Sequence, residues 1–160
     1  MEPSACATER VRAPNTPSVA VDSTGTVYAA WSDCRFRAAC TANDIVLARS
    51  PAPGVLTEPE RTPLEPLSGT RDFLLPAITV QPETRGTQAH LALAHHSLTT
   101  PDCTGAGCKL TAGFTTSLDA GRSWRPEAVS DLMQLDWLAR VRSELVGRGL
   151  RARLIWGPGT

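Results

Sequence analysis

The feature that most constrains the fold is an internal repeat of one order of segments. Residues 17–50 and residues 76–117 both begin with a proline and a short apolar run, then pass through a turn and a longer alternating run. Each then has a loop with two cysteines and a last apolar run that ends in serine. Short alternating runs are typical of β-strands. A repeat of this size predicts stacked four-stranded units, because a single such sheet cannot bury both of its faces.

Local patterns place the individual strands of this all-β fold. Residues 17–31 predict a β-hairpin whose turn lies at residues 22–25, with Val19 and Val21 on one face of its first strand. The Pro- and Gly-containing stretch 51–54 is a strand breaker. The other strands are expected at residues 44–50, 76–80, 89–96 and 109–117.

Charge and hydropathy exclude some classes of partner. The chain has 160 residues, with 16 Lys plus Arg and 16 Asp plus Glu, so its formal net charge is zero. A neutral chain has no long-range field that attracts nucleic acid or an acidic membrane, and we expect neither as a partner. No apolar run reaches about 18 residues, the length that a membrane helix needs. We also expect no cofactor.

Five cysteines indicate the redox environment. Cys34 and Cys40 bracket one loop, Cys103 and Cys108 bracket another, and Cys6 stands alone. Pairs that close short surface loops are typical of oxidising compartments, so two local disulfides are predicted. A metal site is one alternative, but neither pair has C-x-x-C spacing and the histidines lie elsewhere, so we assign no metal. Reduced thiols in a cytosolic protein are the other alternative.

The stretch 117–124, SLDAGRSW, gives four residues a structural role. Ser117 closes a strand. Asp119 accepts hydrogen bonds from backbone N–H groups of a turn, and Gly121 allows a positive φ there. Trp124 packs its ring under the turn and between sheets. We therefore predict a structural turn rather than a catalytic carboxylate.

The pattern Ser-x-Asp-x-Gly-x-x-Trp of residues 117–124 resembles the Asp box of the sialidase (neuraminidase) superfamily and of related Asp-box (BNR-repeat) β-propellers. In that family the box lies between the third and fourth strands of a blade. The equivalent stretch of the first unit, residues 50–56, keeps Ser50 and Gly54 but lacks the Asp and the Trp. The resemblance covers residues 14–137 and implies part of a sialidase-like β-propeller with four-stranded antiparallel blades.

The resemblance also implies how the chain is divided. Residues 14–70 are expected to form a blade with a degenerate box, and residues 71–131 a blade with an intact one. Residues 1–13 are expected to be a disordered N-terminal segment. Residues 132–160 are expected either to start a further blade or to form an aberrant tail, because apolar residues at helical spacing in residues 132–145 also predict a C-terminal helix.

Two blades do not close a propeller. The chain is therefore expected to be a piece of a longer protein or to self-associate through open blade edges. The predicted disulfides place the parent protein outside the cell or in the cell envelope. The start of the chain, MEPSACATERVR, has no signal-peptide pattern.

The family's catalytic residues are only partly matched. Arg35 stands where the resemblance places a substrate-binding arginine, and a planar guanidinium suits a carboxylate. The family's Arg-Ile-Pro motif is replaced by residues 15–17, Asn-Thr-Pro, and Tyr28 is the single tyrosine. A tyrosine nucleophile is expected from a later blade, so we assign no catalytic residue.

Two functions follow as expectations. The first is a non-catalytic scaffold that binds a glycan, a glycoprotein or another protein. The second is part of an exo-α-sialidase, a glycoside hydrolase that is active only at full length. An all-helical or cytosolic protein would require the repeat and both cysteine loops to be coincidental.

Overall fold

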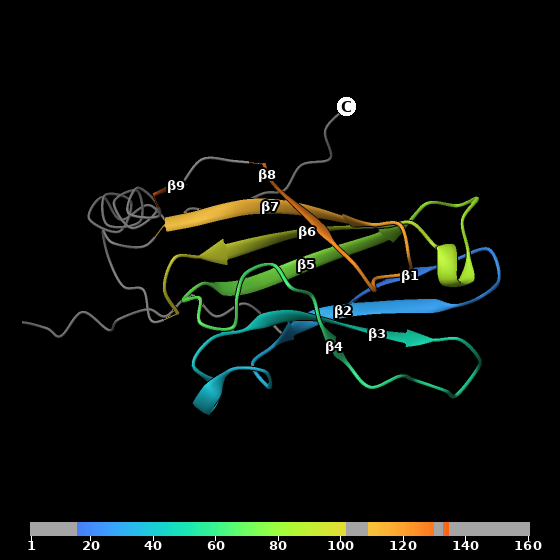
Figure 1. Cartoon of the computed structure of the whole chain (residues 1–160), viewed down its shortest axis with the longest axis horizontal. Helices are drawn as coiled ribbons and strands as arrows, with labels where there is room; N and C mark the ends of the chain where they lie inside the picture. Colours follow the sequence, from blue (N-terminus) through green and yellow to red (C-terminus); the bar gives the residue numbers. More distant parts are fainter. Residues whose placement is uncertain (1–15, 102–108, 130–132, 135–160) are drawn as a thin grey trace, which may run out of the picture.

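The computed structural model describes residues 16–101, 109–129 and 133–134, and these residues form two antiparallel β-sheets (Figure 1). Two single-turn 3₁₀ helices, η1 (Ala38–Cys40) and η2 (Gly86–Gln88), accompany the strands. The expected all-β class is confirmed. The predicted segment 1–13, the pair Cys103 and Cys108, and the expected C-terminal helix lie outside the described residues, apart from two residues of the last.

The first sheet is a meander in which strand order follows chain order. It contains β1 (Ser18–Val21), β2 (Val27–Asp33), β3 (Asp44–Ser50) and β4 (Glu60–Arg61). The hairpin predicted from residues 17–31 is confirmed, because Val21 pairs with Val27 around the expected turn. β3 has the predicted bounds.

The second sheet repeats this plan. It contains β5 (Asp72–Val80), β6 (Leu91–Leu98), β7 (Lys109–Ser117) and β8 (Arg125–Ala128), again in chain order. A short strand β9 (Met133–Gln134) also pairs with β7. These two residues therefore extend the second sheet, although the sequence suggested that residues from 132 onward open a further blade or form a tail.

The start of β5 differs from the prediction. We expected a strand that begins at Pro76, but β5 begins at Asp72 and Pro76 lies inside it. The register shifts between Leu74 and Ala77, and Leu75 has a positive φ of 52°. This bulge accommodates a proline because β5 is an edge strand, where a missing N–H leaves no neighbouring strand unpaired.

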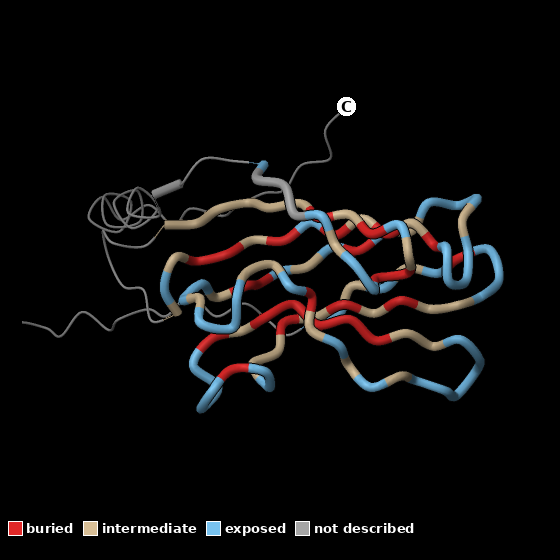
Figure 2. The backbone as a smooth tube through the Cα atoms, viewed as in Figure 1, coloured by how far each residue is buried: buried red, intermediate tan, exposed pale blue. Residues whose placement is uncertain are grey.

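The core lies between the two sheets (Figure 2). Alternation in β2 buries Tyr28 and Ala30 on the face toward the second sheet, because successive side chains of a strand point to opposite faces. Together the two sheets form a cluster of Tyr28, Ala30, Ile45, Leu47, Phe73, Ile78, Ala89, Leu91, Leu93 and Ala120.

Hydrogen bonds join the sheets at both ends. At the end with the β1–β2 turn, the backbone N–H of Gly86 donates to Asp22 Oδ2 at 2.9 Å. At the other end, the N–H of Phe73 donates to the carbonyl of Asn43 at 3.0 Å, and Asp72 Oδ1 accepts from the N–H of Asn43 at 2.6 Å. The two meanders therefore form one packed unit.

Candidate functional site

Residues 117–124 form a turn held by side-chain hydrogen bonds. Ser117 Oγ accepts from the N–H of Gly121 at 2.7 Å and donates to Asp119 Oδ1 at 2.8 Å. Asp119 also accepts from the backbone N–H and the hydroxyl of Ser123, at 2.8 and 2.6 Å. These hydrogen bonds, above all that of the Ser123 hydroxyl, lower the pKa of Asp119. Trp124 Nε1 donates to the carbonyl of Gly121, whose φ is +85°. The turn geometry predicted for these residues is confirmed.

This turn is fixed to the first sheet. Arg49 Nε donates to the carbonyl of Ala120 at 2.6 Å. A Cβ at Gly121 would collide with the side chain of Leu47 in β3. Trp124 is partly buried against the core, as its packing role predicts. The 117–124 turn therefore connects the two sheets, and both oxygens of Asp119 are used in holding it.

The corresponding turn of the first sheet has no carboxylate. Ser50 Oγ donates to the carbonyl of Ala52 at 2.9 Å, and the N–H of Val55 donates to the same carbonyl at 3.0 Å. Gly54 has a φ of +76°. This turn shares two residue types with the 117–124 turn, at Ser50 and Gly54. These two residues thus still form a tight turn.

Asp22 is a second structural carboxylate, at the same end of the sheets. Its Oδ1 accepts from the N–H groups of Thr24 and Thr26 at 2.9 and 3.0 Å. Its Oδ2 accepts from the N–H of Gly86 and from the hydroxyl of Tyr28, the latter at 3.2 Å. Burial alone would raise the pKa of Asp22, but the hydrogen bonds from Thr24, Gly86 and Thr26 hold it well below its usual value.

Tyr28 is buried beneath this carboxylate. Its residue exposure is 0%, and its hydroxyl also contacts the carbonyl of Gly86 at 3.4 Å. Burial, together with the charge of Asp22, raises the pKa of Tyr28 to about 12. A phenol with this pKa stays protonated at neutral pH and is a poor nucleophile.

The predicted ligand residue Arg35 lies at the opposite end of the first sheet, in the loop between β2 and β3. The predicted disulfide Cys34–Cys40 is present and closes this loop. Arg35 is exposed, and its Nη2 and Nε contact Asp33 Oδ2 at 2.7 and 2.8 Å. Asp33 also accepts from Trp31 Nε1 at 3.1 Å. Arg35, Asp33 and Trp31 therefore form a surface cluster, distant from the 117–124 turn.

Arg37 lies two residues further along this loop but is buried. Its Nε and Nη2 form a bidentate ion pair with Asp44 at 2.8 and 2.7 Å, and Nη2 also contacts Glu65 at 2.9 Å. Its Nη1 donates to the carbonyls of Leu67 and Gly69 at 3.0 and 2.8 Å. All five N–H donors of the guanidinium are therefore paired.

A second arginine completes this buried charge network. Arg61 Nη2 contacts Asp44 Oδ1 at 2.9 Å and the carbonyl of Glu65 at 2.6 Å. Burial would raise the pKa of Asp44, but hydrogen bonds from Arg37 and Arg61 lower it. Every donor of Arg37 is paired within the network, although Arg61 Nε is buried without a hydrogen-bond partner among the described residues. The role of the network is to hold segments together.

Neither Asp22 nor Arg37 was predicted from the sequence to be a key residue. Asp22 carried a detectable signal, since an Asp that opens a turn before Ser, Thr and Gly is typical of side-chain to backbone hydrogen bonds. Arg37 carried none, because the acceptors of its Nη1 group lie about thirty residues away along the chain.

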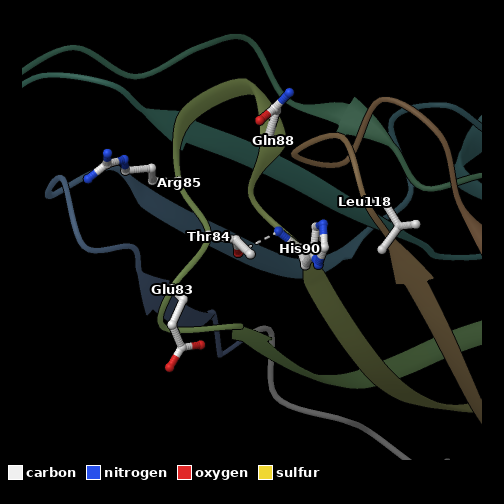
Figure 3. Close-up of a pocket in the computed structure, with 6 residues that line it drawn as sticks. All are labelled: Glu83, Thr84, Arg85, Gln88, His90 and Leu118. Atoms are coloured by element: carbon white, nitrogen blue, oxygen red, sulfur yellow. Dashed lines mark hydrogen bonds between the residues drawn. The ribbon is translucent and has the colours of Figure 1, made fainter.

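A shallow depression of about 440 Å³ lies at the end with the 117–124 turn. Thr84 and His90 lie at its centre, and Thr84 Oγ1 accepts from the N–H of His90 at 2.8 Å (Figure 3). Glu83, Arg85 and Gln88 point in different directions around it. Its full lining is Glu83, Thr84, Arg85, Gln88, His90 and Leu118. Polar groups that diverge in this way do not define a ligand.

Among residues 16–101, 109–129 and 133–134, no group of three His, Cys, Asp or Glu side chains is arranged to hold a metal ion. Within the same ranges no helix is long and apolar enough to cross a membrane.

Comparison with known proteins gives no further assignment. No protein-family model matches the sequence, and no curated protein matches it.

Proposed function

We propose that this chain forms two adjacent blades of a secreted, sialidase-like Asp-box β-propeller that binds a glycan or glycoprotein without hydrolysing it. Each half contains a four-stranded antiparallel meander, which is the form of a propeller blade. The 117–124 turn joins β7 to β8, the third and fourth strands of the second meander. The Asp box of the resembled family occupies this same hairpin.

The disulfide supports the secreted location. The bridge between Cys34 and Cys40 closes an exposed loop. Exposed disulfides persist in oxidising compartments and are rare in the cytosol. An extracellular or cell-envelope protein is the class that this bridge fits best.

The observation that supports binding without hydrolysis is the burial of Tyr28. It is the single tyrosine of the chain and has 0% exposure, and its hydroxyl donates a hydrogen bond to Asp22. A sialidase of the resembled family uses an accessible tyrosine as its nucleophile. This chain has no tyrosine that a substrate can reach.

The surface cluster of Trp31, Asp33 and Arg35 is the proposed ligand-binding site. Asp33 engages Nε and Nη2 of Arg35, while no described residue accepts a hydrogen bond from its Nη1. A guanidinium fixed on one edge and open on the other suits a carboxylate. The partly exposed Trp31 adds an aromatic surface, which suits the apolar face of a sugar ring. We therefore propose a glycan that carries a carboxylate, such as a sialylated one.

Titration of the chain with sialyllactose, followed by NMR, tests this proposal. We expect Arg35→Ala to weaken binding at least about tenfold, equivalent to about 1.4 kcal/mol. Arg35→Lys should give an intermediate affinity, because it keeps the charge but loses the planar fork. Arg85→Ala is the matched control, since Arg85 is an exposed arginine at the opposite end of the sheets.

Each outcome of the titration is informative. Wild-type affinity in Arg85→Ala, together with loss in Arg35→Ala, supports the proposal. Loss in Arg85→Ala alone would move the ligand to the depression near His90. Absence of binding by the unsubstituted chain would contradict the glycan-binding function.

The alternative is that the chain is part of an exo-α-sialidase. The place of Arg35 in the β2–β3 loop favours it, because the resemblance puts a substrate-binding arginine there. A fluorogenic sialoside separates the two functions when it is assayed with a longer protein that contains this chain, because the alternative requires the full length. We expect no release of the fluorophore, and turnover by the longer protein that Arg35→Ala abolishes would overturn the non-catalytic assignment.

A further inference from the structure

We propose that the Cys34–Cys40 disulfide is a redox-controlled latch on the segment that connects the two sheets. While the bridge is closed, the loop places Arg37 so that its guanidinium holds residues 65–69. Reduction by a dithiol opens the loop and breaks the contacts of Arg37 with residues 65–69.

Arg37 is the physical link between the loop and the connecting segment. Its guanidinium reaches Asp44 at the start of β3 and then Glu65, Leu67 and Gly69 of the β4–β5 connection. All five N–H donors of the guanidinium can be paired in only one position of the side chain, because the group is rigid and planar. A displacement of the loop backbone therefore removes several of these hydrogen bonds together.

The loop holds a backbone conformation that reduction would relax. Ala39 and Cys40 have φ values of 52° and 56°, which residues with a Cβ adopt at a cost. The N–H of Arg37 donates to the carbonyl of Cys34 at 2.9 Å, and the N–H of Cys40 donates to the carbonyl of Arg37 at 3.1 Å. Arg37 thus lies between the two bridged residues, and its backbone is hydrogen-bonded to both.

The bridge is accessible to a reductant. Cys40 is exposed and Cys34 is partly exposed. One thiolate of the dithiol attacks the sulfur of Cys40, forms a mixed disulfide and releases Cys34 as a thiolate. The second thiol of the reductant then displaces Cys40 and leaves as a cyclic disulfide. Two electrons and two protons pass to the protein, which ends with two thiols.

Once the loop is open, Ala39 and Cys40 return to negative φ and Arg37 withdraws from the connection. Two backbone amides report on this segment. The N–H of Gly69 donates to the carbonyl of Pro66 at 2.9 Å, and the N–H of Arg71 donates to Glu65 Oε1 at 3.1 Å. Arg35 lies in the same loop, so reduction also frees the ligand arginine if the function proposed above is correct.

Amide hydrogen exchange of the full chain, before and after treatment with dithiothreitol, tests the latch without any glycan. We expect the amides of Gly69 and Arg71 to exchange at least tenfold faster after reduction. The amides of Gly86 and Ser123, which donate to Asp22 and Asp119 at the other end of the sheets, should change less than twofold. Mass spectrometry establishes that the Cys34–Cys40 bridge is open.

Two sets of variants identify the group responsible. The double variant Cys34→Ser, Cys40→Ser should exchange as reduced protein does and should not respond to dithiothreitol, which excludes the other three cysteines. Arg37→Lys should exchange fast while the bridge is closed, and reduction should add little. If Arg37→Lys fails to fold, Glu65→Gln removes a single ion pair of Arg37 and should give a smaller acceleration at Gly69. Gly69 is the reporter for this variant, because the amide of Arg71 donates to Glu65 itself.

Three results would overturn the latch. The first is unchanged exchange at Gly69 and Arg71 when the bridge is shown to be open. The second is slow exchange at both amides in Arg37→Lys, or at Gly69 in Glu65→Gln. The third is equal acceleration at Gly86 and Ser123, because the bridge would then act on the stability of the whole fold.

Discussion

At the scale of single residues, the fold depends on side chains whose charge state is fixed by their neighbours. Asp22 is ionised because its hydrogen bonds outweigh the effect of burial on its pKa. Its contribution to stability is therefore present above the carboxyl pKa of the unfolded chain, near 3.8, and is lost as the pH falls toward the lower pKa of the folded state. Arg37 is held as a cation by Asp44, which raises its pKa.

His95 is the opposite case, because it is buried as a neutral ring. It packs edge-on against Phe73, with ring centroids 5.4 Å apart, and its ring lies so close to Gly113 that a Cβ there would collide with it. Burial, and then the charges of His96 and Arg71, lower the pKa of His95 to about 4. Protonation of this ring therefore opposes folding.

This gives a prediction for stability against pH. The unfolded chain binds a proton at His95 near pH 6.5, but the folded chain binds it near pH 4. The contribution of His95 is present above pH 6.5 and is lost as the pH falls through this window, with a slope of at most about 1.4 kcal/mol per pH unit. Urea unfolding at pH 7.5, 5.5 and 4.5 measures it.

The matched comparison uses two histidine variants. In His95→Leu we expect the fall in unfolding free energy between pH 7.5 and 4.5 to be smaller than in the wild type. His90→Leu removes a histidine at the surface depression and is the control for the substitution itself. An equal slope in His95→Leu and the wild type would contradict the role given to His95.

At the scale of elements, two glycines with nearly the same φ separate backbone strain from packing between the sheets. Gly25 and Gly121 have φ values of +87° and +85°. A Cβ at Gly25 meets no atom within 4 Å, whereas a Cβ at Gly121 collides with Leu47 of the other sheet. Gly25→Ala should therefore cost about 1–2 kcal/mol from backbone strain alone.

Gly121→Ala should cost more than Gly25→Ala. Overpacking against Leu47 adds about 1–3 kcal/mol to the same backbone strain. Chemical unfolding of the two variants against the wild type measures both losses. Equal losses of unfolding free energy in the two variants would mean that the 117–124 turn does not pack tightly against the first sheet.

Strands were predictable where a local pattern determines them. The alternating or apolar runs at residues 44–50 and 109–117 give β3 and β7 with the predicted bounds. β5 was predicted too short, because its bulge between Leu74 and Ala77 places a proline inside an edge strand. A bulge depends on pairing with the neighbouring strand, and a period-two pattern does not contain that information.

The candidate site was predictable to a similar extent. The closure of the loop by Cys34 and Cys40 was predicted from their spacing and is present, whereas the ligand role of Arg35 stays a prediction from the resemblance. Arg35 and Asp33 stand two residues apart in the chain, and the structure pairs them. The burial of Arg37 depends on the β4–β5 connection, so it appears only when distant segments are placed together.

At the scale of the whole molecule, the outer face of the first sheet is apolar near the β1–β2 hairpin. Val19 and Val21 are each 55% exposed. They pair across the sheet with Ala29 and Val27, so all four side chains share the face directed away from the second sheet. An exposed face of this kind favours association.

We predict that this face mediates self-association of the chain. The double variant Val19→Lys, Val21→Glu keeps the net charge at zero and should weaken self-association at least about tenfold, because two apolar side chains leave the contact and two charges enter it. Sedimentation velocity over a range of concentrations measures this effect. Leu118→Glu, at a 55% exposed position in the 117–124 turn, is the control and should behave as the wild type.

The hydrogen bonds at both ends of the sheets mean that the sequence repeat is not an autonomous folding module. A chain cut between β4 and β5 would leave the carboxylate of Asp22 without Gly86, and Asn43 without Asp72 and Phe73. It would also expose one side of a core to which both halves contribute. The two halves are alike in plan, but each supplies what the other lacks, so they gain and lose their structure cooperatively.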